Sequence, residues 1–211
     1  MSNVKPLLDF IAAHESEGAA RRLGISAYDV VWGKIRASDR PRKPLTSMTI
    51  GEVLAWQDSI DKQYQSEAAG RYQIMEDTLR GLWAAAGMRL TDRFDAAGQD
   101  RLATELLNRR GLARYLAGAL STEDFANSLA KEWASLPVVS GPKKGSSYYA
   151  GDGLNRAGVD VEPFLAAVRA VRDAAKAPTA PPAVDVPRRG IWADLIAALL
   201  RLFKGLRDET R

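Results

Sequence analysis

Helical hydrophobic periodicity recurs along residues 1 to about 173, and it constrains the fold of this chain more than any other feature. Pro6 suits the first turn of a helix, and Leu7 and Ile11 follow about one turn apart. A second helix is expected to begin at Thr49. Further helices are expected over residues 77–86, 96–110, 111–118, 122–135 and 161–174. The pattern predicts one mainly α domain over residues 1–173.

Local signals mark several helix ends. Thr49 can cap a helix, and Glu52 three residues later completes a capping box. Ser121 is a suitable cap for the helix that begins at residue 122, and Gly111 is a good C-terminal stop after residue 110.

Two short stretches depart from helical periodicity. "AYDVVWGK", residues 27–34, is rich in β-branched and aromatic residues and predicts a short strand. "GRYQIM", residues 70–75, is interpreted as a second short strand or an extended loop. The expected fold class is therefore mainly α (α+β), with a small β-hairpin region.

The pattern breaks near residue 174. Prolines and alanines over residues 174–190 predict an extended linker, and residues 191–211 predict an amphipathic helix. Its apolar stripe includes Trp192, Leu195, Leu199 and Phe203. Three interpretations stay open for this helix: contact with a membrane surface, docking on a partner or a second copy, or packing on its own domain.

Composition limits the possible chemistry. The chain has no cysteine and a single histidine, His14, so disulfides, zinc-thiolate sites and His-rich metal sites are excluded. Neither a metal nor a cofactor is expected, and conventional chemistry here must come mainly from carboxylates. The net charge of +4 suits an anionic polymer or a membrane surface without identifying either. A monomer without a nucleic-acid partner is expected.

The stretch "FIAAHESEGAARR", residues 10–22, contains two glutamates two positions apart. Because successive helix residues turn by about 100°, Glu15 shares the apolar face of Ile11, whereas Glu17 lies on the opposite side. Gly18 suggests that the helix ends there. Glu17 is then interpreted as a solvated residue near the helix end.

A carboxyl group on a buried helix face is costly to ionise. Desolvation and the negative end of the helix dipole both raise its pKa, so that the acid holds its proton near neutral pH. The alternative is a structural ion pair between Glu15 and an arginine such as Arg21, Arg22 or Arg71.

Two further motifs give these residues a context. Glu15-Ser16 and the stretch Gly70–Gln73 resemble the lysozyme-like superfamily of peptidoglycan-cleaving enzymes, in which an acid followed by serine ends a helix and Gly-x-x-Gln lies across the cleft. The chain is more closely similar to the phage lambda lysozyme family of endolysins. That resemblance covers, in order, "LLDFIAAHES", "AYDVVWG", "DRPRKPLT", "SEAAGRYQIM" and "WASLP".

The resemblance implies a lysozyme-like fold and cleavage of the β-1,4 bond between N-acetylmuramic acid and N-acetylglucosamine in peptidoglycan glycan strands. It implies that Glu15 is the catalytic acid and that the reaction is lytic transglycosylation, which gives 1,6-anhydro products. The alternative is hydrolysis, which needs a second carboxylate. Glu67 is the candidate for that second acid, whereas Glu52 is explained by its cap and Asp29 by support of the hairpin or by a pair with Arg71.

Other candidate site residues contact substrate in this interpretation. Gln73 is a candidate to bind an acetamido group or to orient Glu15. The remaining substrate-binding candidates are Ser66, Tyr72, Tyr148, Tyr149 and Asn155. Exposed tyrosines stack well on sugar faces, but Tyr72 could instead belong to the core and Gln73 could support the backbone of its loop.

A different class of function also fits the sequence. The chain could be a non-catalytic cell-wall-binding or virion module that keeps the fold. The N-terminus is not a good secretory signal, because Asp9 and His14 interrupt its short apolar run. The expectation is therefore a protein made in the host cytoplasm that reaches periplasmic peptidoglycan after release.

Overall fold

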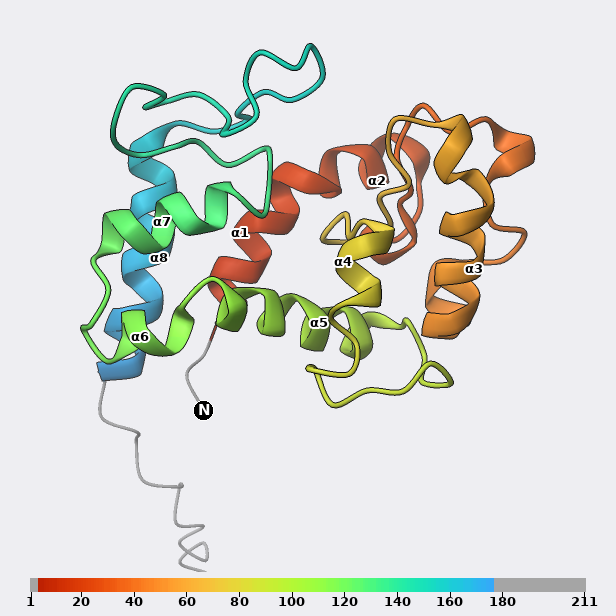
Figure 1. The fold of residues 1–211 in the computed structure, drawn as a ribbon, viewed down its shortest axis with the longest axis horizontal. Coiled ribbons are helices and arrows are strands. Elements are labelled where there is room, and N and C mark those ends of the chain that lie inside the picture. The colour runs from red at the N-terminus through yellow and green to blue at the C-terminus, as the bar shows by residue number, and fades with distance from the viewer. Residues whose placement is uncertain (1–3, 177–211) are drawn as a thin grey trace, which may run out of the picture. The chain divides into compact units, whose positions relative to one another are not determined.

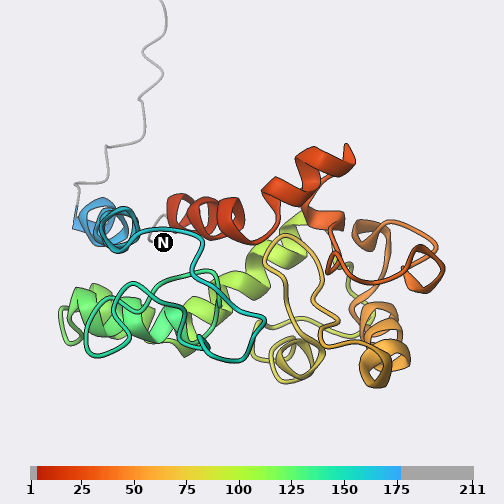
Figure 2. The same cartoon turned by 90° about the horizontal axis from the view of Figure 1, so that it is seen from above.

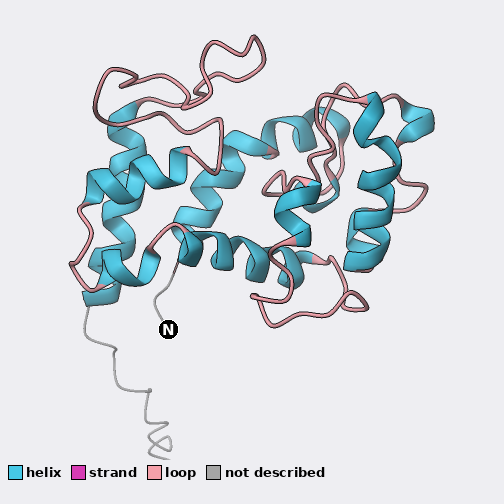
Figure 3. Cartoon of the chain, in the orientation of Figure 1, coloured by secondary structure: helices cyan, strands magenta, loops and turns pink. Residues whose placement is uncertain are grey.

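The structure is a computed structural model that describes residues 4–176, and this part of the chain is mainly helical (Figures 1 and 3). The α-helices are α1 (Lys5–Glu15), α2 (Glu17–Leu23), α3 (Ile50–Ile60), α4 (Glu76–Arg80), α5 (Ala96–Arg109), α6 (Leu112–Leu116), α7 (Thr122–Ala130) and α8 (Val161–Lys176). The short 3-10 helices are η1 (Ala27–Asp29), η2 (Ala37–Asp39), η3 (Leu45–Ser47) and η4 (Asp61–Gln63).

The helices form two groups joined by α5. Helix α8 packs beside α1 and also contacts α6 and α7, while α3 packs against α4 (Figures 1 and 2). Helix α5 begins beside the group of α3 and α4, runs toward the other group and contacts both α1 and α6 there. This arrangement places the C-terminal end of α1 near the turn that precedes α4 and the segment that follows α7.

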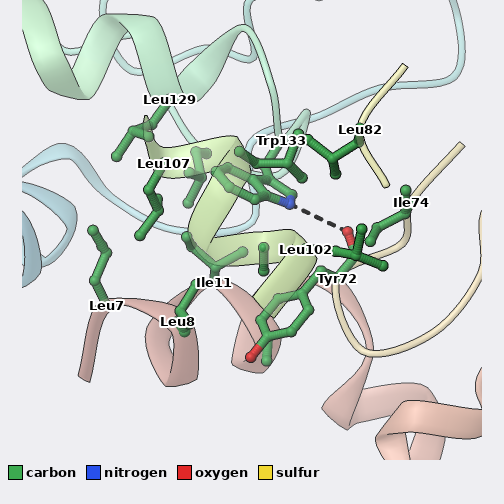
Figure 4. Close-up of a cluster of buried hydrophobic side chains, with 14 of the residues drawn as sticks. Leu7, Leu8, Ile11, Tyr72, Ile74, Leu82, Leu102, Leu107, Leu129 and Trp133 are labelled. Atoms are coloured by element: carbon green, nitrogen blue, oxygen red, sulfur yellow. Dashed lines mark hydrogen bonds between the residues drawn. The ribbon is translucent and has the colours of Figure 1, made fainter. Parts of the chain in front are cut away.

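The core contains the apolar stripe expected for the first helix. Leu7 and Ile11 of α1 are fully buried, and they face Leu102 and Leu107 of α5 (Figure 4). Burial of each such side chain stabilises the fold by about 1.5–3 kcal/mol. The periodicity thus fixes which face of α1 is buried, and Glu15 ends that face.

The predicted caps are confirmed. The Thr49 hydroxyl accepts a hydrogen bond from the Glu52 N–H at 3.2 Å, and the Glu52 carboxylate accepts one from the Thr49 N–H at 2.8 Å. Ser121 Oγ accepts from the Asp124 N–H at 3.0 Å at the start of α7. These bonds satisfy backbone donors that the first turn of a helix leaves free.

The predicted strand over residues 27–34 is wrong, and the described residues do not show the predicted β-hairpin of two strands. Residues 27–29 instead form η1, since Ser26 Oγ accepts from the Tyr28 N–H and caps the turn. Pairing is reduced to single antiparallel bridges from Ala69 to Val31 and to Ile74. Residues 70–75 accordingly form a tight turn followed by an extended residue.

The first helix also ends earlier than Gly18 suggested. Ser16 leaves the helical conformation at φ −134°, and a new helix, α2, begins at Glu17 with Gly18 inside it. The Ser16 hydroxyl is buried and donates to the Arg71 carbonyl oxygen at 2.7 Å. This tertiary bond ties the end of α1 to the turn at residues 70–73 and so sets the position of Glu15.

Candidate active site

A cleft of about 550 Å³ opens beside the C-terminal end of α1. Four segments that are far apart in sequence supply its walls. They contribute Glu15 from α1, Ser66 and Gln73 before α4, Trp133 and Ser135 after α7, and Tyr149 and Asn155 in the loop before α8. The cleft therefore gathers most of the residues predicted to act on substrate.

Glu15 is held in this cleft by one short hydrogen bond. Ser135 Oγ donates to Glu15 Oε1 at 2.5 Å. Among residues 4–176, no cationic group lies within ion-pair distance of the Glu15 carboxyl. The alternative of a structural ion pair with an arginine is therefore wrong within the described chain.

The surroundings of Glu15 favour its protonated form. Burial raises the pKa of the Glu15 carboxyl, and hydrogen bonds from the Ser135 hydroxyl and backbone only partly oppose this effect. Glu15 is also the last residue of α1, where the partial negative charge of the helix end disfavours a carboxylate. The net upward shift of the pKa suits a group that must donate a proton near neutral pH.

Arg71 pairs with other carboxylates. Its Nη2 lies 2.9 Å from Asp9 Oδ1 and 3.1 Å from Glu17 Oε1, and its side chain is only 11% exposed. Glu17, the first residue of α2, is thus ion-paired, and its interpretation as a solvated residue is wrong. The expected pair of Arg71 with Asp29 is also wrong, because the Asp29 carboxylate accepts from the Thr46 N–H at 2.8 Å instead.

The turn that carries Gln73 requires a glycine at its start. Gly70 has φ +77°, and a Cβ there would collide with the side chains of Gln99 and Phe94. The side-chain oxygen Oε1 of Gln99 accepts from the Arg71 N–H at 2.8 Å, and the side-chain amide nitrogen of Gln99 donates to the Phe94 backbone carbonyl. Gln99 is fully buried, so this cradle fixes the turn against α5.

Gln73 lines the cleft in a conformation that is unusual for a residue other than glycine, with φ +47°. Its amide group donates to the Gly70 carbonyl at 2.8 Å and to the Val30 carbonyl at 3.3 Å. The amide nitrogen therefore supports the backbone, while the side-chain oxygen accepts no hydrogen bond from residues 4–176. That oxygen is the part of Gln73 that could accept a donor from a ligand.

Tyr72 and Ser66 have different environments. Tyr72 is only 1% exposed, and its hydroxyl donates to Asp100 Oδ1 at 2.6 Å, on the α5 side. Tyr72 does not line the cleft, so it is not positioned to contact substrate. The alternative interpretation of Tyr72 as a core residue is confirmed. Ser66 does line the cleft, but it is nearly buried and its hydroxyl accepts from the Ala68 N–H.

Glu67, the candidate second acid, is not brought to the cleft. Its side chain is buried, and Oε1 accepts from the Glu76 N–H at 3.0 Å at the start of α4. Its backbone carbonyl accepts from the Gln57 amide at 3.0 Å. A carboxylate at a helix N-terminus is stabilised by the free N–H groups there, so Glu67 has a structural explanation.

The loop before α8 contributes two of its three predicted residues. Tyr149 and Asn155 line the cleft, whereas Tyr148 does not. The Tyr149 hydroxyl donates to the Lys131 carbonyl at 2.7 Å, and the Asn155 amide donates to Asp152 at 2.6 Å. Tyr148 is exposed and packs edge-on against Tyr149 with a centroid distance of 5.2 Å.

The sequence interpretation missed Ser135 and an ion pair in the cleft. Ser135 belongs to the "WASLP" stretch, whose presence was a signal of the family without a role for its serine. Arg110 Nε lies 2.6 Å from Glu132 Oε2, and both residues line the cleft. Trp133 Nε1 donates to the Tyr72 carbonyl at 3.2 Å, which joins the two walls (Figure 4).

Two features of the described residues bear on cofactors and membranes. Within residues 4–176, no group of three or more His, Cys, Asp or Glu side chains could hold a metal ion. No helix in the same range has the length and apolarity needed to cross a membrane. The four tail residues Trp192, Leu195, Leu199 and Phe203 lie outside the described residues.

Comparisons with known proteins agree with the geometry of the cleft. No curated protein and no solved structure matches the chain. A family model described as Endolysin matches residues 5–154, which include α1, the turn at residues 70–73 and most of the residues that line the cleft. The chain therefore belongs to the endolysin family, whose members degrade bacterial cell-wall peptidoglycan for a phage.

Proposed function

We propose that this endolysin is a lytic transglycosylase that cleaves the β-1,4 bond between N-acetylmuramic acid and N-acetylglucosamine. Glu15 is the catalytic acid and base of the proposal. The observation that carries it is the position of the part-buried Glu15 carboxyl group in a cleft where, among the described residues, no cation pairs with it, so that burial raises its pKa.

The reaction needs two proton transfers. Protonated Glu15 first donates its proton to the glycosidic oxygen, and the bond between that oxygen and the anomeric carbon breaks. The Glu15 carboxylate then accepts the proton of the muramic 6-hydroxyl, whose oxygen attacks the anomeric carbon and forms the 1,6-anhydro ring. Glu15 is protonated again at the end, and no water is consumed.

The lack of an available second carboxylate supports transglycosylation over hydrolysis. Hydrolysis by the usual schemes requires a second carboxylate as nucleophile or as base for water. Within the described residues, Glu132 is the other carboxylic acid of the cleft, and its charge is paired with Arg110 at 2.6 Å. Glu67 lies outside the cleft and binds the start of α4.

The other cleft residues suit binding of an amino sugar. The free side-chain oxygen of Gln73 can accept the N–H of an acetamido group, and the ring of Tyr149 can contact a sugar face. Ser66 and Asn155 supply further polar atoms to the walls. Ser135 is a positioning residue in this scheme, because it touches Glu15 through its hydroxyl.

We further propose that residues 1–173 are the catalytic domain, 174–190 a linker and 191–211 an amphipathic helix that contacts membrane. Liposome co-sedimentation of the full chain and a Leu195→Glu/Phe203→Glu variant tests the last part. Equal co-sedimentation of the two proteins would reject it. The enzyme would act on periplasmic peptidoglycan after its release from the cytoplasm.

The experiment that tests the reaction type is digestion of purified sacculi in ¹⁸O-labelled water, followed by mass spectrometry of the released muropeptides. Transglycosylation predicts unlabelled anhydro ends, each lighter by one water than a reducing end. Reducing ends that carry ¹⁸O would show hydrolysis and reject the proposed mechanism.

A further inference from the structure

The cleft contains two cationic side chains that have no anionic partner in the described residues. Lys131 and Arg156 both line it together with Glu15. Within residues 4–176, neither side chain forms an ion pair or a side-chain hydrogen bond, although Lys131 lies over the ring of Tyr148. Arg110 differs from them, because its charge is matched by Glu132.

The charge balance of the cleft is therefore positive. Among the described residues, its three cationic side chains outnumber its two carboxylic acids, which are Glu132, paired with Arg110, and Glu15. Asp152 is on the same loop as Arg156 but does not line the cleft. Its carboxylate accepts from the N–H groups of Leu154 and Asn155 at 2.8 Å.

A third cation strengthens the positive potential at the same loop. The Lys131 and Lys143 ammonium groups lie 5.5 and 5.6 Å from the centroid of the Tyr148 ring. Lys143 also donates to the Tyr148 carbonyl at 2.8 Å. The Tyr149 hydroxyl binds the Lys131 carbonyl, so the loop is held against the segment that carries Lys131.

We propose that Lys131 and Arg156 form an anion subsite that binds a carboxylate carried by the muramic acid of the substrate. Within peptidoglycan such a carboxylate comes from the lactyl group of a bare muramic acid or from an acidic residue of its stem peptide. This inference rests on the proposed function, since it assumes that glycan strands occupy the cleft. It specifies a substrate that carries negative charge, in contrast to neutral N-acetylglucosamine polymers.

The test measures binding of three soluble glycan-strand preparations to full-length protein with the Glu15→Gln substitution, so that strands are not cleaved. The first strands keep their stem peptides, the second are stripped by an amidase, and the third have their carboxylates converted to methylamides. The variant is Lys131→Gln/Arg156→Gln. The matched control is Arg109→Gln/Arg114→Gln, which removes two exposed charges that do not line the cleft.

The proposal predicts that adding Lys131→Gln/Arg156→Gln to the Glu15→Gln protein weakens its binding to carboxylate-bearing strands about tenfold. This difference should shrink at high salt. Methylamidated strands should bind both proteins equally. A loss that persists on stripped strands assigns the lactyl carboxylate, and a loss confined to peptide-bearing strands assigns the stem carboxylates.

Three results would overturn the anion subsite: no loss of binding, an equal loss on methylamidated strands, or an equal loss in the control variant. Turnover by the wild-type chain separates this inference from the proposed function. If the wild type cleaves none of the strands, the proposed function fails, while the binding comparison still decides whether the subsite exists.

Discussion

Ser135 donates a 2.5 Å hydrogen bond to the carboxyl group of Glu15 across 120 residues of sequence. The bond joins the end of α1 to the segment that follows α7, and both line the same cleft. It also acts on the chemistry of Glu15, because a donor to a carboxylate stabilises the ionised form and lowers the pKa.

Substitution of Ser135 by alanine is expected to raise the pKa of Glu15 further. The general acid must be protonated to act, so activity is lost as the pH rises through that pKa. The alkaline limb of the pH profile of kcat/KM should therefore move to higher pH in Ser135→Ala. We also expect kcat to fall by about tenfold, because the carboxyl group is no longer held in place.

Ser135→Thr is the matched control, since it keeps the hydroxyl. It should return the alkaline limb toward its wild-type position. An unchanged profile in Ser135→Ala, or the same displacement in both variants, would contradict a role for this hydroxyl in setting the pKa of Glu15.

Glu15→Gln is expected to stabilise the folded chain at neutral pH relative to the wild type. Burial raises the pKa of Glu15 in the folded state above 4.5, so the protein gains from a protonated Glu15 at low pH and loses that gain as the pH rises. Glutamine does not ionise, so the Glu15→Gln variant avoids the cost of a buried carboxylate at higher pH. Thermal unfolding should show equal Tm values near pH 4 and a higher Tm for Glu15→Gln at pH 8, whereas a difference that does not change with pH would count against a raised pKa.

Arg71→Met is expected to lower the free energy of unfolding by about 2 kcal/mol at pH 7, because Asp9 and Glu17 lose their shared partner. Burial raises the pKa of the Asp9 carboxyl. The hydrogen bonds and positive charges of Lys5 and Arg71 outweigh that effect, so the pKa is lowered below 3.8. The contribution of that pair is present above pH 3.8 and is lost as the pH falls. Urea unfolding at pH 7 and pH 3 should show a smaller difference at pH 3.

Arg71→Lys separates charge from geometry. A lysine keeps the charge but lacks the planar fork that reaches two carboxylates at once. Its free energy of unfolding should lie between those of the wild type and Arg71→Met. Equal stability of all three proteins would show that the ion pairs contribute nothing.

Glu67→Gln should keep wild-type activity within about twofold, because a glutamine oxygen can still accept the Glu76 N–H. Glu67→Ala removes that acceptor and should lower the free energy of unfolding by about 1–2 kcal/mol. Initial rates of muropeptide release and urea unfolding measure the two effects. A loss of activity of several hundredfold in folded Glu67→Gln would restore Glu67 as a second acid.

Local sequence signals predicted most of the helices and their caps. The capping box of Thr49 and Glu52 and the apolar stripe of α1 depend on contacts within a few residues, and both are present. The strand expected at residues 27–34 failed because β-propensity depends on a pairing partner, and only Val31 has a bridge there. The break at Ser16 depends on a bond to Arg71, 55 residues away.

The candidate site was predictable only in part, because several of its contacts also join residues that are far apart in the sequence. Helical phase placed Glu15 on the buried face, and the resemblance directed attention to Gln73. The contributions of Ser135 and of the pair between Arg110 and Glu132 come from long-range packing that no local pattern encodes. Tyr72 is likewise buried by packing in the core, and its hydroxyl bonds to Asp100 on α5, 28 residues away.

We propose that Glu15, and not its neighbour Glu17, is the catalytic residue. The most direct test is the rate of muropeptide release from purified sacculi by Glu15→Gln and Glu17→Gln, measured well below the Tm of both. Glu15→Gln should lose activity by about 10³-fold, and Glu17→Gln should stay within about twofold of the wild type. Retention of more than about a tenth of wild-type activity by folded Glu15→Gln would contradict the account.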